Sequence, residues 1–319
     1  MNRNPKKVFG LHLAILLVLF LMQFVLPAYH HTTVARIMVL ASFAVGYNIL
    51  LGYTGLMSLG HAMFFSAGMY GAGLGIYHLG LSGLQGFGAG LLSALLLSLM
   101  FGVIALRTSG VSFLIVTLMF GQTLFLALLY FNEVTLGQDG FSLSQSLKPL
   151  SFGTAELPFS DPDVKYNIAW LLFAVCFLLS ALLVLSPAGR VLIAIRENEE
   201  RTKLLGYNTY LYKLFSLVVS GTIAGAAGAV HALLFSYVGT TFAEIHHSIS
   251  PLLWTLLGGM GTTIGPLLGT GIMHYLIDIT SGFTSGYLFV VGAVLLLLVL
   301  WFPQGLMGAV RTKWVSWLP

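Results

Sequence analysis

The stretch from Gly52 to His61 is the first candidate for chemistry, because it sets small and polar residues between two apolar blocks. It reads GYTGLMSLGH, with three glycines and no Lys, Arg, Asp or Glu. In a bilayer, non-helical backbone persists only where protein buries it or where it lines a cavity, since an unpaired amide costs several kcal/mol. Two interpretations stay open: a plain turn, or a substrate site in which helix ends point N–H groups at a carboxylate. The candidate pathway residues are Gly52, Gly55, Ser58, Leu59, Gly60 and His61.

A second glycine-rich break, GGMGTTIGP, interrupts the apolar block from Pro251 to Ile277. That block is too long for one comfortable span and too short for two. The sequence therefore predicts a broken helical hairpin, in which Thr262 or Thr263 caps the second helix and the proline lies in its first turn. The expected hinge residues are Gly258, Gly259, Gly261, Gly265 and Pro266.

The segment RENEERTKLLGYN, residues 196–208, differs from the rest of the chain because it is densely charged. Six of the eight residues from Arg196 to Lys203 carry charge, and Gly206 is a suitable C-cap for a short helix. A solvated loop that follows the positive-inside rule explains the basic residues but not the glutamates. We therefore favour a docking surface for a soluble partner. Its expected contact residues are Arg196, Glu197, Asn198, Glu199, Glu200 and Gly206.

Motifs for catalysis are missing from the sequence. It contains no HExxH, no GxSxG and no Walker A motif, and none of its lysines follows a glycine, so the chain does not hydrolyse ATP itself. The single cysteine, Cys176, excludes an intrachain disulfide and a thiolate metal site, and we expect no bound metal. The ionisable residues expected at membrane depth are His61, His78, His274 and Asp278.

These candidate residues must be positioned by membrane helices, as the composition of the chain indicates. The 319 residues are 57% hydrophobic and only 8% charged, whereas soluble proteins carry about a quarter of charged residues. We expect an all-α polytopic membrane protein, a single transmembrane domain over residues 1–319. Nine apolar blocks occur, at 9–29, 34–51, 62–79, 84–106, 111–131, 166–186, 214–237, 251–277 and 287–302. Ten crossings, or eight and a re-entrant hairpin, both fit, so we expect about eight to ten.

Lysine and arginine in the connections predict the orientation. Basic residues gather in the N-terminal tail, in residues 187–213 and at the C-terminus, which places these segments and both termini in the cytoplasm. The longest connection, residues 132–165, carries five acidic residues against Lys148 and Lys165 and is expected outside, in the periplasm. Because the net charge is only +4, nucleic-acid binding is not indicated.

Several segments resemble the membrane subunits of branched-chain amino acid ABC importers, the Liv-type permease family, to which urea permeases also belong. Residues 52–73 are similar to the family's Gly-x-x-Gly-x-x-Ser-Leu-Gly-His stretch, and TLGQDGF, residues 135–141, to its Thr-x-Gly-x-Asp-Gly segment. The charged segment resembles the family's ATPase-coupling loop. The remaining similar segments are SGTIAGAAGA (220–229), GGMGTTIGPLLG (258–269) and FPQGLMG (302–308).

The resemblance implies a place in a larger machine in the bacterial inner membrane. Such a permease pairs with a homologous permease, two cytoplasmic ABC ATPase subunits and a periplasmic substrate-binding protein. This chain would then bind no cofactor, because ATP and Mg²⁺ belong to the ATPase subunits. Residues 187–213 would be the coupling loop, and the segments around Asp139 and Glu244 would meet the binding protein.

Three functions remain in competition at this point. The first is ATP-driven import of branched-chain or related aliphatic amino acids, with Ser58 and His61 near a helix N-terminus as a cradle for a carboxylate. The second keeps the machine but carries urea or short-chain amides. The third, of another class, is a stand-alone ion-coupled carrier with Asp278 as its relay.

Overall fold

The computed structural model describes residues 5–152, 155–284, 286–302 and 304–313, and within them the chain is almost entirely helical. Arg3, part of the predicted basic tail, lies outside the described residues. The helices are α1 (Pro5–Met22), α2 (Ala28–Asn48), α3 (Ala62–Leu79), α4 (Gly83–Ala105), α5 (Gly110–Tyr130), α6 (Asn132–Thr135), α7 (Pro162–Leu185), α8 (Pro187–Glu197), α9 (Glu199–Leu204), α10 (Thr209–Phe235), α11 (Ile245–Gly258), α12 (Gly265–Phe283), α13 (Tyr287–Trp301) and α14 (Leu306–Lys313). A π-helical turn η1 (Ile49–Tyr53), a 3₁₀ turn η2 (Thr240–Ala243) and the strands β1 (Phe141–Ser142), β2 (Leu150–Phe152), β3 (Ala155–Leu157) and β4 (Tyr237–Val238) complete the elements.

The predicted apolar blocks correspond closely to these helices. The block at 62–79 coincides with α3, and those at 84–106 and 111–131 are each displaced by one residue from α4 and α5. Helices α2, α10 and α11 begin five or six residues before their predicted blocks, and the first block ends too late, because α1 ends at Met22 and Pro27 is the N-cap of α2. A proline cannot continue the preceding helix and fits at the start of the next one, which explains why the boundary lies earlier than predicted.

Five helical segments are long and apolar enough to cross a membrane, which makes this a multi-pass membrane protein. They are His30–Tyr53, Gly83–Ala105, Gly110–Tyr130, Pro162–Leu185 and Thr209–Phe235. Two shorter apolar helices, Lys7–Met22 and Leu288–Leu298, accompany them. The all-α class is confirmed, whereas the number of eight to ten crossings stays a prediction.

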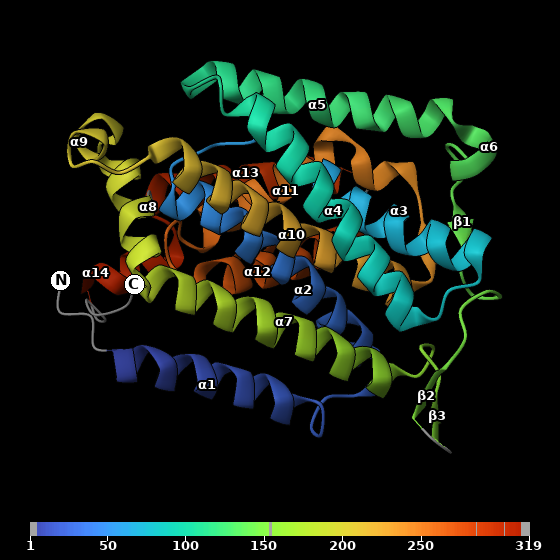
Figure 1. Cartoon of the computed structure of the whole chain (residues 1–319). Coiled ribbons are helices and arrows are strands. Elements are labelled where there is room, and N and C mark those ends of the chain that lie inside the picture. Colours follow the sequence, from blue (N-terminus) through green and yellow to red (C-terminus); the bar gives the residue numbers. More distant parts are fainter. Residues whose placement is uncertain (1–4, 153–154, 285, 303, 314–319) are drawn as a thin grey trace.

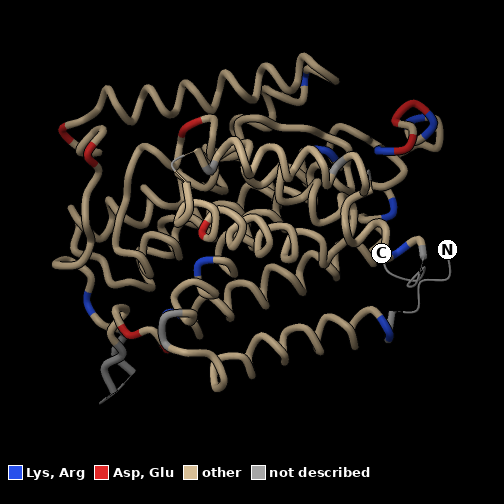
Figure 2. Tube along the Cα trace, turned by 180° about the vertical axis from the view of Figure 1, so that it is seen from behind, with Lys and Arg blue, Asp and Glu red and all other residues tan. Residues whose placement is uncertain are grey.

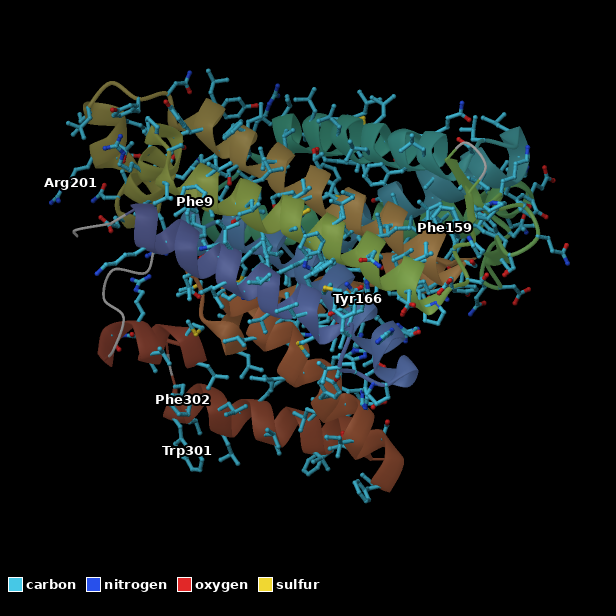
Figure 3. All side chains as sticks on the ribbon, turned by 90° about the horizontal axis from the view of Figure 1, so that it is seen from below. Phe9, Phe159, Tyr166, Arg201, Trp301 and Phe302 are labelled. Carbon is cyan, nitrogen blue, oxygen red and sulfur yellow. The ribbon has the colours of Figure 1, made fainter. Side chains whose placement is uncertain are left out.

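Helices α2 and α10 form the centre of the bundle (Figure 1). Of their most apolar windows, 94% and 83% of the residues are buried, against 22% for both α4 and α5. Helix α10 packs against α2, α3 and α4, and α2 packs against α7 and α12. Helices α11 to α14 form a layer on the other side of α2, from which Trp301 points outward (Figure 3). The more exposed helices therefore surround two helices whose most apolar parts are largely buried.

The irregular segments gather at the two opposite ends of the bundle. Helices α8, α9 and α14 lie at one end, and α6 with β1 to β3 at the other (Figure 1). Charged residues cluster at these ends, with few between them (Figure 2). At the second end β1 pairs antiparallel with β4, with Phe141 opposite Val238, so the segment 135–141 is held against the end of α10.

Glycine allows α3, α4 and α10 to pack with their backbones in contact. A Cβ added at Gly90 would lie 2.8 Å from the Cβ of Ala229 and would also overlap the Gly68 carbonyl. A Cβ at Gly225 would overlap that of Ala94, and one at Gly228 would overlap the Phe65 carbonyl. Small residues give membrane helices this close approach, from which van der Waals contacts follow.

We expect Gly90→Ala to lower the thermal midpoint of unfolding in detergent, because overpacking costs about 1–3 kcal/mol. Gly88→Ala is the matched control on the same helix, since Gly88 is exposed and its added Cβ meets nothing within 4 Å. That control is expected to leave the midpoint unchanged or slightly raised. Equal midpoints for the two variants would contradict the packing argument.

Candidate functional site at two helix breaks and a charged loop

The first break starts where α2 loses its regular hydrogen bonds. Five residues form the turn η1, the chain then runs without regular structure to His61, and α3 begins at Ala62. Gly55 has φ of 78°, a left-handed conformation that glycine adopts without strain. The break therefore has two parts, a π-helical turn and a segment without regular structure.

The second break separates α11 from α12. Gly259 and Gly261 have φ of 122° and 72°, which explains why glycine stands at both positions. The Thr262 hydroxyl donates to the Gly259 carbonyl at 2.7 Å and accepts from the Gly265 amide at 3.2 Å. Pro266 lies in the first turn of α12, where its missing N–H costs nothing. The sequence predicted this break. Ile264 occupies the N-cap position of α12 without a side-chain cap bond, so Thr262 supports the helix start only through the amide of its first residue.

Asn48 joins the two breaks, which are far apart in the sequence. Its side-chain Nδ2 donates to the Thr262 carbonyl at 2.8 Å, and its Oδ1 accepts from the Gly261 amide at 3.0 Å. The side chain is only 1% exposed, so these bonds satisfy an amide that burial would otherwise penalise. Sequence reasoning missed Asn48. The available signal was a lone asparagine inside an apolar span, which needs partners from elsewhere in the chain.

Arginines from two other elements bind the same pair of breaks. Arg196, near the end of α8, donates a hydrogen bond to the Gly52 carbonyl. Arg311 of α14 donates to the Gly261 carbonyl at 3.3 Å. A Cβ on Gly261 would lie 3.0 Å from the Gly52 oxygen and 2.9 Å from Arg196 Nη1. The charged loop, both glycine-rich breaks and the C-terminal helix thus meet at one point.

Ser58 and His61 lie in the interior, with exposures of 1% and 0%. His61 Nε2 lies 3.0 Å from the Ser220 hydroxyl, which donates to the Gly46 carbonyl at 2.6 Å. Because that hydroxyl has one proton, the Nε2 of His61 is the donor in their contact. The Ser58 hydroxyl accepts from the Gly60 amide at 3.3 Å. In this conformation the His61 side chain joins the break to α10 and the Ser58 side chain bonds within the break, and their place in a substrate pathway stays a prediction.

The rest of the first break is fixed by α5 and α11. The Leu59 amide donates to Thr117 Oγ1 at 3.2 Å, and the Ala62 amide donates to Ser248 Oγ at 2.9 Å. A Cβ on Gly60 would overlap the Thr117 carbonyl, so only glycine fits there. The exposed residues of the stretch are Gly55 and Met57, the latter 41% exposed. The break and the start of α3 are therefore bonded to both α5 and α11.

The charged loop consists of α8 and α9 with Asn198 between them. The Asn198 side chain caps α9 by accepting from the Arg201 amide at 2.9 Å. Glu199 turns inward, where it accepts from Lys213 at 2.7 Å and from Thr209 at 3.0 Å. These contacts fasten α9 to the start of α10. Asn198 and Glu199, two of the predicted docking residues, thus also stabilise the loop itself.

The outer edge of the loop carries the remaining candidates together with apolar residues. Glu197 is exposed, and the Glu200 side chain is 81% exposed and paired with Lys203 at 2.9 Å. Leu204 and Leu205 beside them are 87% and 75% exposed. Gly206, with φ of 88°, ends this helical segment, as the sequence predicted. The edge mixes negative charge with exposed leucine, and sequence reasoning missed its apolar part.

The ionisation of Glu199 depends on this arrangement. Partial burial pushes the pKa of Glu199 upward, but hydrogen bonds from Lys213 and Thr209 and the positive charges nearby outweigh burial, so the pKa lies below its usual value. A lowered carboxyl pKa stabilises the fold above the unfolded-state pKa, and this stabilisation is lost as the pH falls through the folded-state pKa. At neutral pH Glu199 is therefore ionised, and its contacts with Lys213 and Thr209 hold α9 against α10 as a clamp.

We expect Asn48→Leu to destabilise the protein by about 2 kcal/mol or more, because it leaves a buried carbonyl and a buried amide unpaired. The readouts are the thermal midpoint in detergent and the rate of proteolysis at residues 259–264. Asn167→Leu is the control, because Asn167 is exposed on α7 and bonds only locally to the Asp163 carbonyl. A wild-type midpoint in Asn48→Leu would show that Asn48 does not hold the breaks together.

We expect Glu199→Gln to speed amide hydrogen exchange in residues 199–206 by roughly 5–30-fold, the equivalent of 1–2 kcal/mol. The wild type should loosen in the same way as the pH falls below about 4.3, the ordinary glutamate value. Glu200→Gln removes the same charge from an exposed pair and should change exchange little. Equal exchange in both variants would argue against the clamp.

Comparison with known proteins places this chain in a family. The family described as "Branched-chain amino acid transport system / permease component" matches residues 30–300. The high-affinity branched-chain amino acid transport system permease protein LivM of Salmonella typhimurium is 30% identical over 307 residues, covering 86% of this chain and 69% of that protein. LivM of Escherichia coli is 29% identical with the same coverage. BraD of Pseudomonas aeruginosa is 27% identical, covering 84% of this chain and 91% of that protein. No solved structure matches the chain.

A permease component is a transport subunit and not an enzyme, and in such ABC systems ATP is hydrolysed by a separate subunit. The family assignment agrees with the multi-pass helical fold and with the resemblance seen in residues 52–73 and 196–208. This chain belongs to the family of permease components of branched-chain amino acid ABC transport systems.

Proposed function

We propose that this chain is the membrane-spanning permease subunit of an ATP-driven importer of branched-chain or related aliphatic amino acids in the bacterial inner membrane. It pairs with a second homologous permease, two cytoplasmic ABC ATPase subunits and a periplasmic substrate-binding protein. Residues 187–213 and both termini face the cytoplasm, and residues 132–165 face the periplasm. Family membership and the gathering of charge at opposite ends of the bundle support this orientation.

The contact between Arg196 and the Gly52 carbonyl carries the proposal. Arg196 belongs to the charged loop, whereas Gly52 belongs to the first helix break. Asn48 connects that break to Gly261, beyond which α12 begins. A displacement of α8 is therefore passed directly to two hinges, from which α3 and α12 start. This is a physical route by which an ATPase subunit outside the membrane tilts helices inside it.

The exposed edge of the loop is the proposed contact with the ATPase. Glu197 and Glu200 offer negative charge, and Leu204 and Leu205 offer exposed apolar area. Apolar area of this kind is typical of a surface that a partner protein covers. Asn198 and Glu199 hold this edge in place through the cap of α9 and the clamp to α10. At the opposite end of the bundle, the segments around Asp139 and Glu244 are the proposed contacts with the binding protein.

The proposed movement also gives the predicted pathway residues a role. The hinge residues Gly258, Gly259, Gly261, Gly265 and Pro266 would change conformation as α12 tilts. Since α3 starts directly after His61, the same movement would open the packed segment from Ser58 to His61 and expose its backbone amides to the cargo. The names of the relatives that match over most of this chain, LivM and BraD, are those of branched-chain amino acid permeases, which supports an aliphatic amino acid as that cargo.

We expect the complete complex in proteoliposomes, supplied with its binding protein, to take up labelled leucine only with ATP, and excess urea not to compete. Arg196→Gln should reduce leucine uptake by about tenfold or more while ATP hydrolysis continues, because a charge-assisted contact in the route is lost. Both rates are measured on the same vesicles.

Arg107→Gln is the matched control, because Arg107 is exposed in the connection after α4, outside the proposed route. Normal uptake by Arg196→Gln would overturn the coupling route. Competition by urea, with no leucine uptake, would assign the urea class of cargo instead. Leucine uptake that is independent of ATP would contradict the importer itself.

A further inference from the structure

A cavity of about 510 Å³ lies between α2 and α12, on the half of α12 that is remote from its glycine-rich start. Its volume falls in the range of about 300–1,000 Å³ that is usual for small-molecule sites. Thr32, Thr33 and Arg36 of α2 face His274, Ile277 and Asp278 of α12. With Ser281 of α12, the lining contains one fixed cation, one carboxylate, one imidazole, three hydroxyls and an aliphatic side chain.

Arg36 is the unusual residue of this cavity. From Val34 to Thr54, every residue of the chain is buried except Arg36. Its guanidinium lies 4.7 Å from the centre of the Phe235 ring at the end of α10, a cation–π contact that leaves the N–H groups free to bind. Sequence reasoning counted Asp278 among the ionisable residues at depth but missed Arg36.

The two opposite charges of the cavity, Arg36 and Asp278, do not form an ion pair with each other. Within the part of the chain that the structure describes, neither Arg36 nor Asp278 has an ion-pair partner. His274 lies one helical turn before Asp278 on the same face of α12 and lines the same cavity. A guanidinium and a carboxylate, separated by a cavity and unpaired, fit a ligand that carries both charges.

This face of the bundle does not suit lipid. A charged side chain facing hydrocarbon costs at least about 2.5 kcal/mol, and such residues normally face a bundle interior or a water-filled path. Phe235 lies two residues before β4, and α12 ends at Phe283, so the cavity lies toward the end of the bundle that carries the β1–β4 pair. On the proposed orientation, this is the periplasmic side, where the binding protein releases its cargo.

We propose that the cavity between α2 and α12 binds the zwitterion of an α-amino acid, with Arg36 holding the carboxylate and Asp278 holding the ammonium group. This inference rests on the proposed function, and it adds the place where this chain first contacts the cargo. Bidentate donors of arginine match a carboxylate, and the hydroxyls of Thr32 and Thr33 supply further polar contacts. The aliphatic side chain would lie against Ile277.

The test uses the complete complex, reconstituted in nanodiscs without the binding protein, and measures equilibrium binding of labelled leucine. We expect Arg36→Gln and Asp278→Asn each to weaken binding by about tenfold or more, since each removes a charge-assisted hydrogen bond. Arg36→Lys keeps the charge but not the planar fork and should give an intermediate loss. In the wild type, 4-methylpentanoate and 3-methylbutylamine, which each carry one of the two charges, should compete at least about tenfold more weakly than leucine.

Arg107→Gln serves as the control for loss of a positive charge, and co-purification with the ATPase subunits checks assembly. Should Arg36→Gln fail to assemble, Asp278→Asn decides the question, because Asp278 is exposed and asparagine has the same shape. Wild-type binding in the assembled variants, or equal competition by either singly charged analogue, would overturn the site. A wild type that binds no leucine would overturn it as well.

ATP-driven uptake with the binding protein, measured in parallel, separates this inference from the proposed function. Normal leucine uptake together with unchanged binding in both variants overturns the site and leaves the importer intact. Leucine binding that depends on Arg36 and Asp278, without any ATP-driven uptake, supports the site and overturns the importer.

Discussion

The architecture depends on the need to satisfy backbone polar groups where helices are broken inside an apolar bundle. Asn48 provides the solution for the second break, because its amide group pairs with the Thr262 carbonyl and the Gly261 amide. Arg196 and Arg311 satisfy the neighbouring Gly52 and Gly261 carbonyls. Without these partners the breaks would carry unpaired groups at a cost of several kcal/mol. The same bonds connect the breaks to the loop and to the C-terminal helix.

A hinge of this kind has to be both held and able to move. The glycines at positions 259 and 261 adopt conformations that other residues reach only with strain, so the chain can bend there. The groups that hold the hinge are hydrogen bonds, which break and re-form more easily than interdigitated apolar side chains. By contrast, α3, α4 and α10 are packed backbone to backbone through Gly68, Gly90 and Gly225, which favours their movement as one body.

Charge is used sparingly and in distinct ways. The clamp between Glu199 and Lys213 is partly shielded from water and fixes the loop to α10, one of the two central helices. The pair of Glu200 and Lys203 is exposed and contributes little to stability, so Glu200 remains available to a partner. Arg36 and Asp278 are kept apart across a cavity. The first pair serves the fold, Glu200 faces the solvent, and Arg36 and Asp278 line the cavity.

The sequence by itself determined the apolar helices, the two glycine-rich breaks and the charged loop, because hydrophobic periodicity, glycine and charge density act over a few residues. It also pointed to the family through short motifs such as residues 52–61. Only the tertiary structure decided which polar groups meet, since Asn48 and Thr262 are 214 residues apart. For the same reason, the sequence could not show that Ser58 and His61 are buried in this conformation or that Glu199 accepts a hydrogen bond from Lys213, and the roles predicted for these residues stay predictions. The type of a side chain is local information, but its direction and its partners depend on which helices lie next to it.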